Sequence, residues 1–109
     1  MVTSGLGEFE QLVLLALLQL GPEAYGVAIR DEIEARTGRA VHLGAVYTTL
    51  LRLEQKRLVA TRLGEPTPHR GGRRKKFYRP LPAGRRELAA SLRALRRMTQ
   101  GLNPGLELP

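Results

Sequence analysis

The sequence has no cysteine and no tryptophan, and its two histidines are His42 and His69. The lack of cysteine excludes a disulfide scaffold, a thiolate zinc site and a cysteine nucleophile. Two histidines that lie 27 positions apart are too few for a convincing metal cluster. We therefore expect that the protein uses neither a metal nor another cofactor.

A long hydrophobic run is also missing. The strongest run, Leu12–Leu18, has seven residues, whereas a transmembrane helix needs about 20 apolar residues. Glu8 and Glu10 precede this run, where a secretory signal would carry Lys or Arg. The sequence therefore predicts a cytoplasmic protein with no membrane partner.

Positive charge is scarce in the first half of the chain and abundant in the second. The 109 residues suit one small domain. Residues 1–61 carry six basic and seven acidic side chains, whereas residues 62–109 carry twelve basic and three acidic ones. A chain polarised in this way suits an anionic partner, most often nucleic acid.

The first predicted helix covers residues 8–20 and is apolar nearly all round. One apolar face repeats at spacings of three, four and seven, and Leu14, Leu15 and Leu18 add apolar side chains on other faces. Such a helix should be buried on more than one side. In a chain of this size we expect a second subunit to cover the further side.

The rest of the chain predicts a mostly α fold with a small β-hairpin, in the α+β class. Periodicity and Gly/Pro breakers predict helices over 25–36 and 44–56, strands over 58–63 and 75–79, and a last helix over 82–100. The last helix carries Leu88, Leu92, Leu95 and Leu102 in a heptad-like seam. We expect residues 1–7 to be flexible and the tail 103–109 to be disordered.

The third predicted helix has an apolar face and an opposite face that is small and polar. Val46, Leu50 and Leu53 form the apolar face. The predicted outer face consists of Ala45, Thr48, Thr49 and Arg52. Small side chains let a helix approach base edges in the major groove, where Thr and Arg can bond bases or phosphates. An ordinary solvated helix face would give the same pattern.

A basic hairpin segment at residues 70–79 favours the DNA-binding interpretation. It holds six basic side chains and no acidic one. The residues predicted to contact DNA here are Arg70, Arg73, Arg74, Lys75 and Lys76. A charge run alone is usually just solvated, but this one directly follows a helix suited to the major groove. Together the two features predict binding to double-stranded DNA.

Three stretches of the sequence resemble the PadR-type transcriptional regulators. Residues 44–54, GAVYTTLLRLE, resemble the recognition-helix signature of this family, and Tyr25-Gly26 resembles the start of its second helix. Residues 71–79, GGRRKKFYR, followed by Ala83-Gly84-Arg85, resemble its wing and the beginning of its C-terminal helix. The resemblance covers about residues 8–100. The single short C-terminal helix is similar to the family's small subgroup.

The resemblance implies a winged helix-turn-helix domain over 8–80 and a C-terminal dimerisation helix over 81–102. It further implies a homodimer that represses promoters. Tyr47 would then place its hydroxyl on a DNA phosphate, although a half-buried structural tyrosine would also fit.

The resemblance also implies that a small aromatic or cationic effector binds between subunits. The apolar residues that could line such a pocket, or the dimer interface, are Phe9, Leu12, Val13, Leu88, Leu92, Leu95 and Met98. A structural core explains these residues equally well.

Two residues depart from the family pattern. Arg57 stands where the family usually has Gly, and if that backbone is left-handed the cost is roughly 1 kcal/mol. Leu81 stands where Thr usually caps the last helix, which costs about 1 kcal/mol of capping energy. Neither residue belongs to the predicted DNA surface.

Two other function classes were weighed against a DNA-binding regulator. A winged-helix module that binds protein or RNA would need apolar anchors or an aromatic platform, and the third helix and the five scattered aromatics supply neither. An enzyme would need a set of nucleophile, base and orienting residues. Instead, the carboxylates of Glu8, Glu10, Asp31, Glu32 and Glu34 are expected to be solvated on helix faces, so we expect no enzymatic activity.

Overall fold

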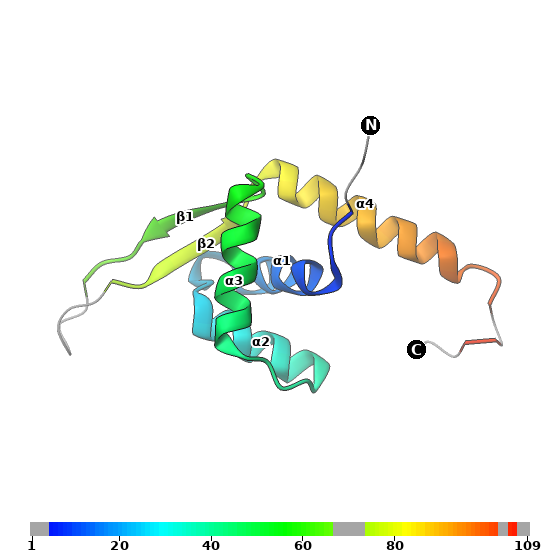
Figure 1. Cartoon of the computed structure of the whole chain (residues 1–109), viewed down its shortest axis with the longest axis horizontal. Helices are drawn as coiled ribbons and strands as arrows, with labels where there is room; N and C mark the ends of the chain where they lie inside the picture. Colours follow the sequence, from blue (N-terminus) through cyan, green and yellow to red (C-terminus); the bar gives the residue numbers. More distant parts are fainter. Residues whose placement is uncertain (1–4, 67–73, 103–104, 107–109) are drawn as a thin grey trace.

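A computed structural model describes residues 5–66, 74–102 and 105–106. The elements follow the predicted order of three helices, a hairpin and a long helix (Figure 1). Their bounds are α1 Glu8–Leu20, the 3-10 turn η1 Gly21–Glu23, α2 Gly26–Thr37, α3 Leu43–Gln55, β1 Val59–Leu63, β2 Lys76–Pro80 and α4 Pro82–Thr99. The α+β fold class is therefore confirmed.

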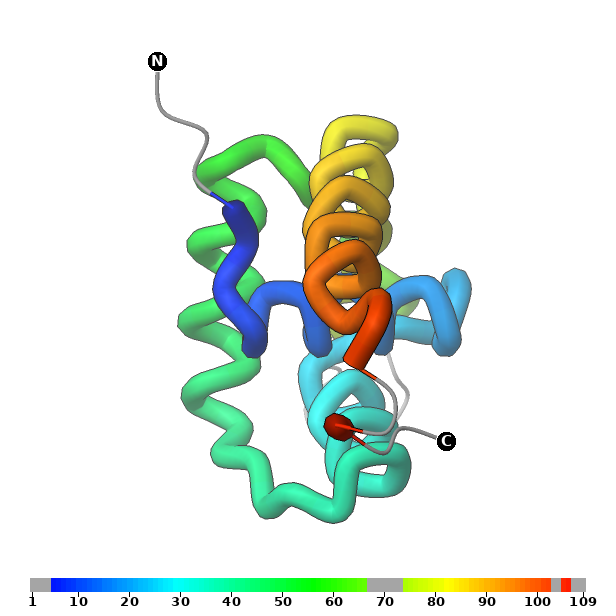
Figure 2. Tube along the Cα trace, turned by 90° about the vertical axis from the view of Figure 1, so that its right-hand side faces the viewer, coloured from blue at the N-terminus to red at the C-terminus, as the bar shows by residue number. Residues whose placement is uncertain are grey.

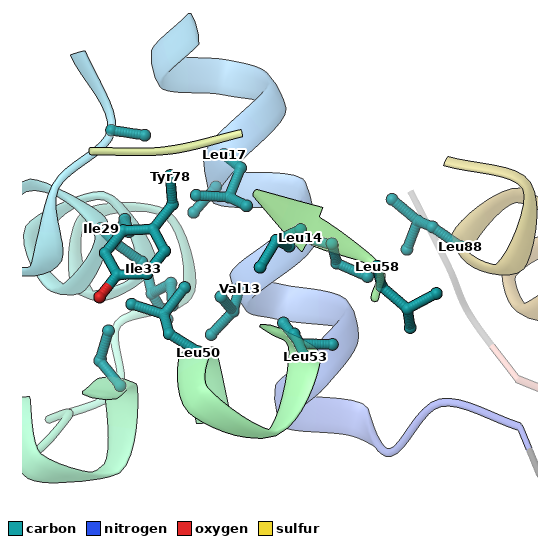
Figure 3. Close-up of a cluster of buried hydrophobic side chains, with 14 of the residues drawn as sticks. Val13, Leu14, Leu17, Ile29, Ile33, Leu50, Leu53, Leu58, Tyr78 and Leu88 are labelled. Atoms are coloured by element: carbon teal, nitrogen blue, oxygen red, sulfur yellow. The ribbon is translucent and has the colours of Figure 1, made fainter. Parts of the chain in front are cut away.

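Helix α1 is the central element of the core. It packs against α2, α3, β2 and the start of α4. Its residues Val13, Leu14 and Leu17 are at most 1 % exposed and meet Ile29, Leu50 and Leu53 from the other helices (Figure 3). Leu18 stays 38 % exposed and Leu12 and Leu15 are half-buried, so the expectation that a second subunit covers a further side of this helix stays a prediction.

The N-terminal segment is partly fixed, which corrects the expectation for residues 5–7. Leu6 is buried in the core, and its carbonyl oxygen accepts a hydrogen bond from Gln11 Nε2 at 3.0 Å. The Gly7 amide donates to Glu10 Oε1 at 2.9 Å. Residues 1–4 of the predicted flexible segment, and most of the predicted disordered tail, lie outside the described residues.

Backbone turns set the ends of α2 and α3. Gly38 ends α2 with φ 73°, the left-handed conformation that glycine adopts without strain. Arg57 follows α3 with φ 60°. The suspicion raised by the sequence is thus confirmed: a residue with a Cβ occupies a left-handed position, at a cost of about 1 kcal/mol.

The hairpin is antiparallel, with Val59 opposite Pro80 and Leu63 opposite Lys76. Its β2 strand is tied to the segment between η1 and α2, because the Tyr78 amide donates to the Ala24 carbonyl oxygen at 2.8 Å. Tyr25 forms an isolated antiparallel bridge with Phe77. The base of the hairpin is therefore held against the beginning of α2, and its far end extends away from the helices (Figure 1).

Helix α4 touches the domain only through its first turns. Leu81 is its N-cap and makes no side-chain capping bond, as the sequence indicated. A Cβ on Gly84 would collide with the Leu58 carbonyl oxygen, so glycine is needed for this close approach. Beyond Leu88 the helix projects away from the domain, as Figure 1 shows, and Figure 2 shows it pointing toward the viewer.

Candidate nucleic-acid interface

One face of α3 is fixed in the core and the other is open. Val46, Leu50 and Leu53 are fully buried and hold the inner face. The exposed residues of the helix are Gly44, Ala45, Tyr47, Thr48, Leu51, Arg52 and Gln55. In Figure 1 this helix lies in front of the domain, between the hairpin and α4.

The exposed face is turned relative to the predicted one. Thr49 was expected on it, but only 5 % of Thr49 is exposed, so its hydroxyl is not available to DNA. Leu51, which is 55 % exposed, and Gln55 were missed. Both follow Thr48 at helical spacings of three and seven, a periodicity that the sequence contains but that the apolar character of Leu51 obscured.

Tyr47 packs across the start of α2. It is 45 % exposed, and a Cβ on Gly26 would collide with its ring and hydroxyl group. The Tyr-Gly pair at 25–26 thus has a physical role, because only glycine leaves room for this ring. The packing places the Tyr47 hydroxyl close to the N-terminus of α2, where backbone amides favour an anion.

Aromatic rings at the base of the hairpin hold two of its cations. The Tyr25 and Phe77 rings meet edge to face, with centroids 5.8 Å apart. Lys75 Nζ lies 4.1 Å from the Tyr25 ring centroid, and the Arg62 guanidinium lies 4.4 Å from that of Phe77. Arg62 also donates to the Pro22 carbonyl oxygen at 3.0 Å. Each cation–ring contact at an exposed site contributes about 0.5–1 kcal/mol.

The predicted cations of the hairpin differ in how they are held. Arg74, Lys75 and Lys76 are exposed, and Lys76 Nζ lies 3.8 Å from Glu54 Oε1 at the end of α3. Lys75 therefore links the hairpin to Tyr25 at the start of α2, and Lys76 links it to Glu54 near the end of α3. Arg70 and Arg73 lie outside the described residues.

Glu10 is buried rather than solvated, which corrects another expectation from the sequence. Its side chain is 7 % exposed, and its Oε2 accepts a hydrogen bond from Lys56 Nζ at 2.9 Å. Burial alone would raise the pKa of this carboxyl group, but hydrogen bonds from Lys56 and the Gly7 amide, with the charges of Lys56 and Arg52, hold the pKa below its usual value. The ion pair ties the end of α3 to α1 and so fixes the helix that bears the open face.

The residues predicted for a dimer interface or effector pocket fall into two groups. Val13 and Leu88 are buried in the core of the single chain, so they cannot line either one, and that part of the prediction is wrong. Leu92, Leu95 and Met98 on α4 are 39 %, 56 % and 77 % exposed. The structure brings none of these three into the core. Phe9 and Leu12 are half-buried on α1.

A shallow apolar groove of about 210 Å³ runs between α1 and α2. Its lining residues are Leu12, Leu15, Ala16, Gln19, Glu32, Ile33, Arg36 and Thr37. Leu12 is the one residue of the predicted pocket that lines it. The groove is bordered by the Glu32–Arg36 ion pair and by the hydrogen bond from Arg36 to Gln19.

The described residues contain neither a candidate metal site nor a membrane-spanning helix. Within it, no group of three or more histidine or acidic side chains could hold a metal ion. Among the same residues, no helix has both the length and the apolar character needed to cross a membrane.

Three helices followed by a hairpin whose second strand is tied to the segment just before α2 form a winged helix-turn-helix. Residues 14–90 match the Transcriptional regulator PadR-like family. The chain therefore belongs to the PadR-like family of transcriptional regulators. Members of this family regulate transcription, which implies that they bind DNA.

Several solved structures have the same fold. A transcriptional regulator from Clostridium thermocellum is 22 % identical, with a TM-score of 0.71 and 91 % of each chain covered. A PadR family regulator from Clostridium difficile is 21 % identical with the same TM-score, covering 91 % of this chain and 99 % of the other. A PadR family regulator from Eggerthella lenta is 28 % identical, with a TM-score of 0.66 and coverage of 94 % and 88 %. Among curated proteins, none matches significantly.

Proposed function

We propose that the protein is a homodimeric repressor that binds a pseudo-palindromic site in double-stranded DNA. Each subunit places α3 in a major groove, and the two recognition helices enter successive grooves about 34–36 Å apart. Repression follows when the bound dimer occupies a promoter.

The observation that carries the dimer is the apolar stripe on α4. Leu92, Leu95 and Met98 follow one another at spacings of three and lie on a helix that leaves its own domain. A single chain does not cover them, and exposed apolar surface of this kind is typical of protein–protein contacts. A second copy supplies the partner, because the same stripe is self-complementary about a two-fold axis.

The exposed face of α3 supports the DNA contact. Gly44, Ala45 and Thr48 are small, so the N-terminal part of the helix can approach base edges closely. Arg52 is exposed on the same face and can reach guanine or phosphate. We propose that Tyr47 contacts a phosphate, and the support is that its ring and hydroxyl lie beside Gly26 at the N-terminus of α2.

The hairpin supplies contacts that do not depend on sequence. Arg74, Lys75 and Lys76, together with Arg70 and Arg73, are proposed to bind phosphates beside the major groove. Such contacts release counterions, so they give affinity that falls with salt.

A small-molecule effector is proposed to bind between the subunits. The support is the apolar groove beside Leu12 and the half-buried Phe9 on the same helix. A small aromatic or cationic compound bound there would change the angle between subunits and so the distance between the two recognition helices. The effector would thus act through DNA binding.

Competition binding tests the assigned roles. A preferred duplex is first selected from random-sequence DNA with the full chain. We expect Arg74→Ala to weaken this duplex and random duplex equally and to reduce the slope of log K against log salt by about 1. Arg52→Ala should instead change which duplexes are preferred.

The reverse pattern would overturn the role assignment. Equal or tighter binding of single-stranded DNA or RNA at matched salt would favour the alternative, a winged-helix module that binds RNA. Binding of neither nucleic acid would leave a protein partner.

A further inference from the structure

Leu51 is the one large aliphatic side chain on the open face of α3. The core side of the helix is already filled by Val46, Leu50 and Leu53, each fully buried. Leu51 is 55 % exposed and has no place in that core. An isolated exposed leucine is common on protein surfaces. The position of this one on the helix gives it a different meaning.

Leu51 lies close to the middle of the exposed face. Helical spacing puts it three residues after Thr48, four before Gln55 and seven after Gly44, and all four positions are exposed. Tyr47 and Arg52 lie toward the two borders of this face. Tyr47 leans onto Gly26 at the start of α2. A groove that receives this face of α3 therefore also receives the Leu51 side chain.

The aliphatic group can recognise little in the major groove. Base edges there present hydrogen-bond donors and acceptors, which a leucine cannot pair, and one apolar group, the C5-methyl of thymine. Burial of a polar base edge under an aliphatic side chain costs free energy, whereas contact with the methyl removes apolar surface from water.

We propose that Leu51 is a specificity-determining residue that selects thymine through its C5-methyl group. This inference rests on the proposed binding of α3 in the major groove. It gives a base-reading role to an apolar residue that has no place in the core. Arg52 and Thr48 beside it would read or bind by hydrogen bonds, so the helix combines polar and apolar recognition.

The test uses sites selected from random-sequence duplex DNA by the wild-type chain and by Leu51→Ala. The wild type is expected to enrich thymine at one position in each half-site, and Leu51→Ala should lose that preference while it keeps the others. Leu51→Met, which conserves volume and apolar character, is the matched control and should keep the thymine preference.

Modified bases then isolate the methyl group. Uracil in place of the selected thymine removes only the methyl and should weaken wild-type binding roughly fourfold, as expected for one buried methyl group. At the same position, 5-methylcytosine should bind more tightly than cytosine. Neither change should affect Leu51→Ala. Uracil at a thymine elsewhere in the site is the control for effects on the duplex itself.

The outcomes separate this inference from the function on which it rests. If the wild type selects a site and Leu51→Ala selects the same bases, with equal losses on uracil substitution, the role of Leu51 is wrong and the DNA-binding proposal stands. If the wild type selects no duplex, both are wrong. Because Leu51 is exposed, unchanged thermal unfolding of Leu51→Ala verifies that the variant is folded.

Discussion

Helices α3 and α4 carry apolar residues at similar spacings but differ in what covers them. In α3, the inner face is fully buried by the same chain, and mostly small or polar side chains remain outside. In α4, which is 18 residues long, Gly84 and Leu88 are the buried residues, and the apolar stripe of Leu92, Leu95 and Met98 is exposed. Within one chain, burial on α4 therefore stops near Leu88, and the exposed stripe beyond it is the surface that we propose a second copy covers.

The largest expected effect comes from a charge placed in the α4 stripe. In the proposed dimer, Leu95→Glu would place one carboxylate from each subunit in the interface. We therefore expect the free energy of association to become less favourable by about 3 kcal/mol or more. Sedimentation over a range of concentrations measures the change. Ala90→Glu adds the same charge to another exposed face of α4 and should leave the association unchanged. Equal effects of the two variants would show that the stripe is not the interface.

The next largest effect is expected at the contact between Gly84 of α4 and the Leu58 carbonyl oxygen. Gly84→Ala drives a methyl group into the Leu58 carbonyl oxygen, so we expect a loss of about 1–3 kcal/mol in the free energy of unfolding. Gly44→Ala is the matched control, since nothing lies within 4 Å of a Cβ there. That variant should gain up to about 1 kcal/mol from helix propensity. Urea unfolding compares them, and a harmless Gly84→Ala would contradict the close approach.

The ion pair that holds α3 to α1 gives a pH-dependent effect. Glu10→Gln should destabilise the protein by about 1–3 kcal/mol at pH 7, because it removes a charged partner of Lys56 from a buried site. The pKa of Glu10 is lowered in the folded state, so its contribution is complete above the unfolded pKa and is lost as the pH falls through the folded value.

Urea unfolding of both proteins from pH 7 down to pH 3 measures the difference. The stability gap between wild type and Glu10→Gln should shrink as the pH drops below 4.5, the ordinary value for this group. The exposed Glu8–Arg39 pair is present in both proteins, so it cancels in the comparison. A gap that does not change with pH would mean that the charge of Glu10 is irrelevant.

The smallest effect concerns the turn after α3. Arg57→Gly should stabilise the fold by about 0.5–1 kcal/mol, because glycine adopts the φ of 60° without strain. The greater freedom of glycine in the unfolded chain offsets part of this gain. Arg57→Ala removes the same side chain and keeps the Cβ, so it should show no such gain. Thermal unfolding of wild type and both variants measures the difference. Equal stabilities of Arg57→Gly and Arg57→Ala would contradict backbone strain at this position.

Much of the fold could be predicted because local signals coincide with the ends of elements. Gly21-Pro22 ends α1, Gly38 ends α2, and Pro82 begins α4, so the helix bounds follow from backbone chemistry. The left-handed turn at Arg57 was one of two possibilities that the resemblance left open, since the family usually has glycine there. These features depend on one residue and its neighbours, and they need no knowledge of tertiary contacts.

The errors concern residues whose surroundings come from distant parts of the chain. Thr49 is polar, yet the rotation of α3 on its core places it inside. Glu10 is a charged residue near a helix start, and Lys56, 46 positions later, makes its burial tolerable. Most apolar residues of α1 pack against elements of the same chain, and periodicity alone cannot distinguish such contacts from contacts with a partner subunit.

Sedimentation of the protein with a selected duplex tests the central claim most directly. We predict a complex of two 12.1 kDa chains on one duplex, and the same two chains without DNA at micromolar concentration. Moving the half-sites apart by half a helical turn should abolish the complex, because the paired recognition helices no longer face the same side. A single chain of 12.1 kDa, free and on DNA, indifferent to half-site spacing, would contradict the account.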